Sequence, residues 1–183
     1  MPIFSVPHRS KFLSFFLLVS VYFSCRCESN TSTGKEQTLA IIKPDGLFNN
    51  YTDEIKNVIL DSGFAICKEM TLQLDEDGVR TFYVEHSLKS FFHSLITYMT
   101  SGPVLVMVLE KENAVADWRA LIGPTDSRKA KITHPHSLRA MCGIDSEKNC
   151  VHGSDSPQSA QREVSFFFKE MSAGSSVMEH DEL

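Results

Sequence analysis

The residue with the clearest capacity for covalent chemistry is His152, in the stretch Asn149-Cys150-Val151-His152-Gly153-Ser154-Asp155. A neutral imidazole is nucleophilic near neutral pH and can accept a phosphoryl group when its tautomer and orientation are fixed. Glu163, on the next predicted helix, could fix them by accepting a hydrogen bond, and Ser154 could join the same network. These residues predict a phosphoryl acceptor. The alternative is a structural histidine at the end of a strand.

Cationic side chains that could bind phosphate occur in two places. Lys43 opens the sequence Lys43-Pro44-Asp45-Gly46, and a basic segment lies between Arg119 and Arg139. In a chain with a formal net charge of −5 at pH 7, this local excess of positive charge indicates a phosphate site. A solvated basic loop is the alternative. The acidic net charge argues against a general nucleic-acid binder.

Hydropathy patterns predict the elements that must position these side chains. The predicted order is strand, helix, strand, helix pair, strand, helix, long loop, strand and helix, at residues 39–42, 52–63, 64–74, 75–99, 104–109, 113–122, 124–148, 151–152 and 156–168. The first strand enters a turn at 44–46, and the helix pair breaks near 87–90. This order predicts an α/β sandwich of one sheet with helices packed on it.

The two ends of the chain are typical of targeting signals. Residues 1–27 combine a basic start with a short apolar segment at 12–23, which predicts a secretory signal peptide; a short membrane anchor is the alternative. The chain ends in His180-Asp181-Glu182-Leu183, a retrieval signal for the endoplasmic reticulum. We therefore expect a protein of the endoplasmic-reticulum lumen that has no membrane span after cleavage.

The rest of the chain divides into three parts. A polar linker at 28–37 leads to a globular domain at 38–170, and a polar tail follows at 171–183. The whole chain has 183 residues, of which 42% are hydrophobic, and this suits one domain with an adequate core.

Three cysteines follow the expected cleavage site: Cys67, Cys142 and Cys150. An oxidising compartment permits disulfides. No pair of cysteines has the spacing of zinc ligands, so we predict no zinc site. A bond between Cys142 and Cys150 would constrain the loop that carries Arg139, and activity would then respond to reductant.

The stretch from Asn149 to Asp155 resembles the active-site signature of the nucleoside diphosphate kinase family. The similarity covers about residues 38–169. It implies a ferredoxin-like α/β (α+β) sandwich in which helices cover an antiparallel four-stranded sheet. It also implies that His152 is the phosphorylated histidine and that Glu163 and Ser154 are its orienting partners.

The resemblance extends to the residues around the transferring phosphate. Lys43 is similar to the lysine that contacts this phosphate, and Tyr83 to the tyrosine placed beside that lysine. An ammonium group there would stabilise charge on the phosphoryl oxygens. Considered without the resemblance, Lys43 is a solvated turn residue and Tyr83 a core aromatic.

The remaining family positions concern the nucleotide. Arg119, Thr125 and Arg139 are similar to the phosphate-binding residues, with Mg²⁺ held mainly through the nucleotide phosphates. Asn149 is similar to the residue that bonds the ribose hydroxyl, and Phe92 to the aromatic that stacks on the base. Considered alone, Arg119 is a surface arginine, and one of the two residues at 91–92 packs in the core.

The resemblance implies a nucleoside diphosphate kinase that takes its phosphate from ATP by a ping-pong mechanism, acts on nucleoside di- and triphosphates and requires no nucleic acid. A homo-oligomer is compatible with it. The loop at 123–139 is longer than usual, Ser146-Glu147-Lys148 replaces a more apolar Val-Gly-Arg, and the usual C-terminal extension is missing. These departures resemble a divergent branch of the family. The alternatives are a weakly active or inactive nucleotide-binding module retained in the reticulum, and a protein phosphotransferase.

Overall fold

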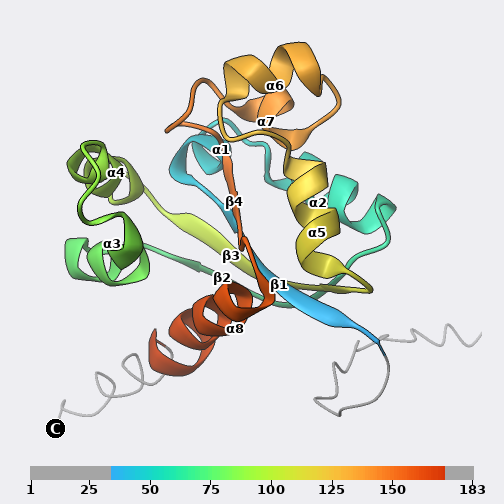
Figure 1. Cartoon of the computed structure of the whole chain (residues 1–183), viewed down its shortest axis with the longest axis horizontal. Helices are drawn as coiled ribbons and strands as arrows, with labels where there is room; N and C mark the ends of the chain where they lie inside the picture. Colours follow the sequence, from blue (N-terminus) through green and yellow to red (C-terminus); the bar gives the residue numbers. More distant parts are fainter. Residues whose placement is uncertain (1–33, 172–183) are drawn as a thin grey trace, which may run out of the picture.

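The computed structural model describes residues 34–171, and a four-stranded antiparallel sheet forms its centre (Figure 1). Its strands are β1 (Glu36–Ile42), β2 (Ala65–Leu72), β3 (Val104–Lys111) and β4 (Val151–Gly153), in the order β2-β3-β1-β4. The apolar runs at 39–42 and 104–109 are buried because they belong to the two central strands. The predicted ferredoxin-like sandwich is confirmed.

Helices pack on both faces of the sheet. The face that includes Ala40 and Ile42 packs against α2 (Thr52–Asp61), α5 (Ala114–Ile122) and α7 (Leu138–Cys142). The face that includes Leu39 and Ile41 packs against α3 (Glu76–Phe82), α4 (Phe92–Met99) and the π-helix Phe166–Met171, which continues α8 (Pro157–Ser165). Side chains alternate along a strand, so β1 contributes to both cores.

The break in the predicted helix pair is confirmed, with a 3-10 helix, η1 (Val84–His86), between α3 and α4. The helix α3 is capped by Asp75, whose carboxylate accepts from the Gly78 N–H at 2.7 Å. The helix α8 is capped by Ser156, whose hydroxyl accepts from the Ser159 N–H, and Pro157 occupies its first position. These caps set the start of the two helices that flank the candidate site.

The prediction of an unstructured loop at 124–148 was wrong. This segment contains α6 (Ser127–Thr133) and α7, which lie together beside one end of β4 (Figure 1). Their lengths of seven and five residues are too short to produce a clear apolar period, so only their caps, Asp126 and Ser137, marked them. A further short helix, α1 (Pro44–Phe48), occupies the predicted turn at 44–46.

Two expectations concern residues outside the described part of the chain. The predicted signal peptide at 1–27 and the C-terminal retrieval signal both lie there.

The domain was expected to begin at Thr38, and β1 begins two residues earlier, at Glu36. Within residues 34–171, no helix combines the length and the apolarity needed to cross a bilayer.

Among the strands of residues 34–171, β4 pairs only with β1, and this pairing determines where His152 lies. Ile41 is opposite His152 and Ala40 is opposite Gly153 in the antiparallel ladder. Gly153 packs tightly against Trp118, whose indole N–H donates to the His152 carbonyl at 3.1 Å. The backbone of β4 is therefore fixed from both sides, by β1 and by α5.

Replacing Gly153 by alanine tests this close packing. The new Cβ would lie 2.5 Å from two atoms of the Trp118 ring, which is fully buried and cannot move aside. We expect Gly153→Ala to lower the free energy of unfolding by about 1–3 kcal/mol, measured by urea denaturation. Gly34→Ala is the matched control, because a Cβ there has no heavy atom within 4 Å. Equal losses of stability in the two variants would contradict this packing.

Candidate active site

A cavity of about 430 Å³ brings together most of the residues singled out in the sequence. The predicted site residues that line it are Lys43, Tyr83, Arg119, Thr125, Arg139, Asn149, His152 and Glu163. Ser154 lies behind the wall, and Phe92 is not part of the lining. The lining comes from the end of β1, the α3–α4 connection, α4, α5, α7, the segment before β4, β4 itself and α8, so the site exists only in the folded chain.

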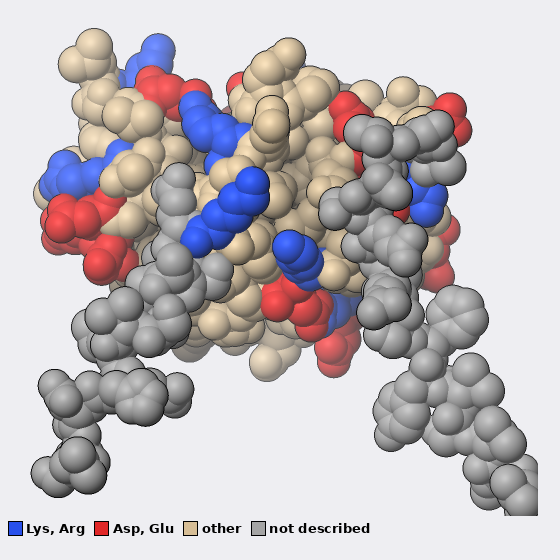
Figure 2. Space-filling model, turned by 90° about the horizontal axis from the view of Figure 1, so that it is seen from below, with Lys and Arg blue, Asp and Glu red and all other residues tan. Residues whose placement is uncertain are grey.

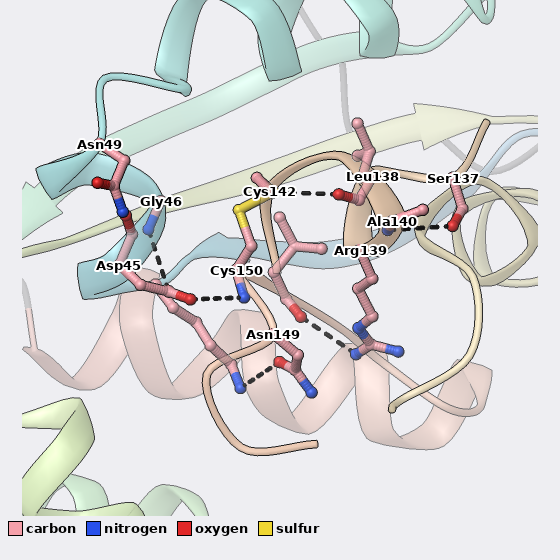
Figure 3. The surroundings of a disulfide bond; sticks show 12 residues. Asp45, Gly46, Asn49, Ser137, Leu138, Arg139, Ala140, Cys142, Asn149 and Cys150 are labelled. Atoms are coloured by element: carbon pink, nitrogen blue, oxygen red, sulfur yellow. Dashed lines mark hydrogen bonds between the residues drawn. A yellow bond between two sulfur atoms is a disulfide. The ribbon is translucent and has the colours of Figure 1, made fainter. Parts of the chain in front are cut away.

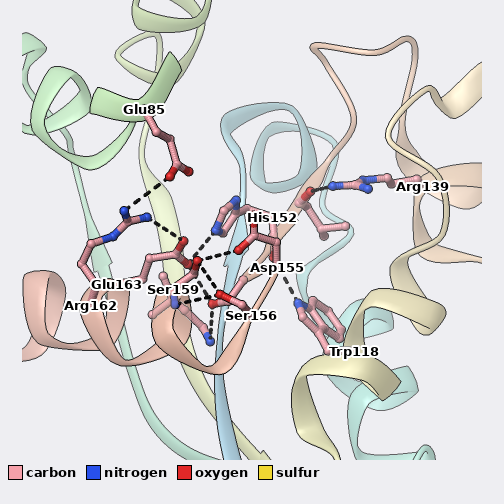
Figure 4. A network of polar contacts seen from close by, with 12 residues as sticks. Glu85, Trp118, Arg139, His152, Asp155, Ser156, Ser159, Arg162 and Glu163 are labelled. Atoms are coloured by element: carbon pink, nitrogen blue, oxygen red, sulfur yellow. Dashed lines mark hydrogen bonds and ion pairs between the residues drawn. The ribbon is translucent and has the colours of Figure 1, made fainter. Parts of the chain in front are cut away.

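His152 is oriented by a carboxylate on α8. Its Nε2 lies 2.9 Å from Oε2 of Glu163, which also accepts a hydrogen bond of 2.8 Å from the Ser154 hydroxyl (Figure 4). The Ser154 oxygen accepts in turn from the Leu39 N–H of β1. A carboxylate can only accept, so this contact places the proton on Nε2 and leaves the lone pair on Nδ1.

Lys43 lies at the end of β1, buried, and its ammonium group donates to Oδ1 of Asn149 at 2.7 Å. Burial, followed by the nearby charge of Arg139, lowers the pKa of Lys43 to about 8. The Asn149 amide donates to the backbone oxygens of Thr125 and Ser146, and these two hydrogen bonds fix the orientation of the Asn149 side chain. Lys43 is thus a buried cation at the cavity wall.

Arg139 is the second buried cation of the cavity. Its guanidinium donates to the Gly123 carbonyl at 2.9 Å and to the Val151 carbonyl at 3.1 Å. Burial and then the positive charge of Arg119 lower its pKa to about 10. Two backbone carbonyls hold it, and no carboxylate neutralises it in the contacts that the described residues make. A guanidinium held in this way retains its attraction for an anion.

Two buried polar atoms at the cavity have no hydrogen-bond partner among the described residues: the Tyr83 hydroxyl and Nε of Arg139. Burial and the charge of Glu163 raise the pKa of Tyr83, so its hydroxyl stays protonated and can donate. Buried polar groups are normally paired, and each unpaired one needs an explanation. Both atoms belong to residues that line the cavity, which favours a polar ligand there.

The cavity gathers charged side chains of both signs. Its lining contains three cations and four carboxylates: Lys43, Arg119, Arg139, Glu85, Glu147, Asp155 and Glu163. On the face shown in Figure 2, basic and acidic side chains are likewise interspersed. Lys43 and Arg139 are buried and therefore poorly screened, so they would attract a phosphate more strongly than exposed basic side chains would.

A disulfide joins the segment that carries Arg139 to the segment that carries Asn149. Cys142, at the end of α7, is bonded to Cys150, just before β4, and Arg139 lies beside the bond (Figure 3). Cys150 has a φ of +70°, which is uncommon for a residue other than glycine. Its N–H donates to Asp45 and its carbonyl accepts from the Lys43 N–H. The pairing considered from the sequence is confirmed.

Comparison with known proteins identifies the family. The family model described as nucleoside diphosphate kinase matches residues 36–173. Probable nucleoside diphosphate kinase 5 of Arabidopsis thaliana is 63% identical over 78% of this chain and 100% of its own length. The chain belongs to the nucleoside diphosphate kinase family. Nucleoside diphosphate kinase homolog 5 of Danio rerio is 45% identical over 73% of this chain and 60% of that protein.

A solved structure of this family has the same fold. The nucleoside diphosphate kinase of Aquifex aeolicus superimposes with a TM-score of 0.73 and is 39% identical, over 75% of this chain and 97% of that one. The family and the fold expected from the signature around His152 are therefore both confirmed.

The phenylalanine in the cavity lining is Phe91, one position before the expected Phe92. Phe92 begins α4 and packs against the core on the Leu39 face, whereas Phe91 lines the cavity and is 45% exposed. Neighbouring residues at a helix start point about 100° apart, so only one of the two can face the cavity. The sequence identified the pair Phe91 and Phe92, but it did not show which of the two side chains faces the cavity.

Sequence reasoning also missed five polar residues of the lining: Glu85, His86, Ser146, Glu147 and Asp155. Glu85 pairs with Arg162 on α8, beside Glu163. The signal for Glu147 was present, since it stands in the segment that departs from the usual Val-Gly-Arg.

Breaking the disulfide should lower phosphotransfer. Without it, α7 and the Cys150 backbone can separate, and the spacing between Arg139 and His152 loosens. We expect Cys142→Ser to reduce kcat several-fold and stability by about 2 kcal/mol, measured by coupled assay and thermal melts. Reductant should lower the activity of the original chain and leave the variant unchanged. Equal activity of the original chain with and without reductant would refute this coupling.

The lowered pKa of Lys43 predicts a pH-dependent affinity for phosphate groups. Lys43 is charged below about pH 8 and loses its proton above it, so its attraction for a diphosphate is present at low pH and fades through about pH 8. We expect the Kd of ADP, measured by calorimetry, to rise through this pH. Lys43→Gln should bind more weakly at pH 7 and lack the inflection. An inflection that survives in Lys43→Gln belongs to another group.

Proposed function

We propose that this protein is a nucleoside diphosphate kinase that transfers the γ-phosphate of a nucleoside triphosphate to a nucleoside diphosphate through phospho-His152. The observation that carries the proposal is the contact of Glu163 with Nε2 of His152, at 2.9 Å, on the wall of a cavity that contains buried cations. This contact supports Nδ1 as the nucleophile. Family membership supports nucleotides as the substrates.

The transfer has two balanced steps. The Nδ1 lone pair attacks the γ-phosphorus of ATP, the bond to the β–γ bridging oxygen breaks, and ADP leaves with that electron pair. A terminal oxygen of a second nucleoside diphosphate then attacks the phosphorus, and the nitrogen–phosphorus bond breaks to return the lone pair to Nδ1. Nε2 keeps its proton, which stays hydrogen-bonded to Glu163 throughout, so no external base is needed.

The cavity's cations stabilise the charge of the transferring group. Lys43, Arg139 and the more exposed Arg119 face phosphoryl oxygens, and the Tyr83 hydroxyl donates to the same group. Thr125 adds a hydroxyl at the phosphate end. These groups are already held in place by the fold, so little reorganisation accompanies the reaction.

Magnesium would enter with the nucleotide. Among residues 34–171 no group of three His, Cys, Asp or Glu side chains is placed to hold a metal ion, so the phosphate oxygens would be its principal ligands. When bound, Mg²⁺ neutralises negative charge on the β- and γ-phosphates. Arg119, Arg139 and Thr125 hold those phosphates and thereby place the ion.

The nucleoside would lie toward α4. Oδ1 of Asn149 accepts from Lys43 and keeps a second lone pair for a ribose hydroxyl, while its amide group is committed to backbone carbonyls. Phe91, in place of the expected Phe92, offers an aromatic face on which the base can stack.

The proposal also includes the compartment in which the protein acts. The predicted signal peptide and the predicted retrieval signal support residence in the endoplasmic-reticulum lumen, and the disulfide between Cys142 and Cys150 suits an oxidising compartment. We place the chain in the divergent branch of the family because of its longer phosphate loop, and we propose a homo-oligomer by analogy with the family.

The experiment is incubation of the purified full chain with Mg²⁺ and γ-labelled ATP, followed by GDP. We expect an acid-labile, base-stable label that GDP chases into GTP. His152→Ala should lose at least about a thousandfold in rate, while the control His134→Ala, an exposed histidine outside the cavity lining, should not.

Other outcomes would reject the proposal in distinct ways. A label that GDP does not remove would indicate a phosphoprotein or a protein phosphotransferase. Nucleotide binding with no label would indicate a binding module.

A further inference from the structure

A row of rings leads from the phosphoryl acceptor to the far end of the cavity. The ring centroids of His152 and Tyr83 are 6.0 Å apart, those of Tyr83 and His86 are 6.1 Å apart, and those of His86 and Phe91 are 5.8 Å apart. All four residues line the cavity. A nucleotide whose phosphate lies at His152 therefore extends along this row, with its base near Phe91.

A carboxylate lies at the same end. Glu147 lines the cavity, and its Oε2 accepts a hydrogen bond of 2.6 Å from the Ser94 hydroxyl, one helical turn after Phe91. Ser94 is also 3.0 Å from the Phe91 carbonyl. The carboxylate of Glu147 is thus held beside the residue on which the base would stack.

The backbone that carries Glu147 is rigidly built. The Asp145 carboxylate accepts from the N–H groups of Glu147 and Lys148 at 2.8 Å each, and the Lys148 carbonyl accepts from the Ile144 N–H at 2.7 Å. Lys43 also lies 3.4 Å from the Glu147 carbonyl. Glu147 is therefore positioned before any ligand binds, which is the condition for selective recognition.

We propose that Glu147 makes this site selective for guanine nucleotides by accepting hydrogen bonds from the base. This inference rests on the proposed function, because it takes the nucleotide's orientation from it. Guanine presents two adjacent donors, N1–H and the 2-amino group, which match the two oxygens of one carboxylate. A carboxylate has about four acceptor positions, so the contact with Ser94 leaves room for both.

The other bases match this carboxylate less well. Adenine directs the N1 lone pair toward it, cytosine directs N3, and uracil has only one donor on that edge. A site that contains a fixed polar group discriminates against ligands that leave the group unpaired. Stacking on Phe91 alone would not separate the bases, since every base has a π-face. The selectivity would therefore come from Glu147.

The test is calorimetric binding of GDP, IDP and ADP, each with Mg²⁺, to the purified full chain. We expect GDP to bind about tenfold more tightly than ADP, with IDP, which lacks the 2-amino group, between them. Glu147→Gln should bring the GDP and ADP affinities to within about twofold. Glu147→Asp, which keeps the charge but is shorter, should fall between these ratios. Glu112→Gln, an exposed residue outside the lining, is the matched control.

The outcomes separate this inference from the proposed function. Equal affinities for the three nucleotides, or a GDP preference that persists in both Glu147 variants, would overturn the role of Glu147 while leaving phosphotransfer intact. Failure to bind any diphosphate would instead reject the proposed function. Thermal melts of each variant show whether it is folded, so that a lost preference is not mistaken for unfolding.

Discussion

The hydrogen bond between Glu163 and Nε2 of His152 is the interaction on which the rest of the site depends. It requires β4 to pair with β1 in one register, since a shift of one residue would turn His152 to the opposite face of the sheet. It also requires α8 to begin directly after its cap, Ser156, so that Glu163 reaches the strand. Ser154 and Trp118 hold this arrangement from outside the cavity lining, and Gly153 packs closely against Trp118.

The phosphate end of the cavity illustrates a second constraint, the cost of burying cations. Lys43 and Arg139 lie out of water, and their pKa values are lowered as a result. The hydrogen bonds of the two cations go to neutral oxygens, from Asn149 and from backbone carbonyls. The nearby carboxylates of Asp45, Glu147 and Asp145 also favour the charged form of Lys43. The cations are thereby held in place and can still attract an anion. A bound phosphate would complete their hydrogen bonding.

The segment 145–150, directly before β4, contributes to both the phosphate end and the base end of the cavity. The disulfide at Cys150 ties it to α7, Asn149 crosses it to Lys43, and Asp145 shapes the turn that presents Glu147. One side of this segment therefore faces the phosphate end of the cavity and the other faces the base end. A change in its backbone would alter both catalysis and nucleotide choice.

The sequence by itself determined the family and the order of most elements, and it predicted that Glu163 and Ser154 lie around His152, because an unusual local signature and regular hydropathy are both readable along the chain. Tertiary structure alone decided the rest. The short helices α6 and α7 carry too few residues to show a period, and their stability comes from packing. Whether Phe91 or Phe92 faces the cavity depends on the rotation of α4, and the approach of Glu147 to Ser94 joins segments 53 residues apart. Contacts of this kind arise from three-dimensional packing, which no local pattern records.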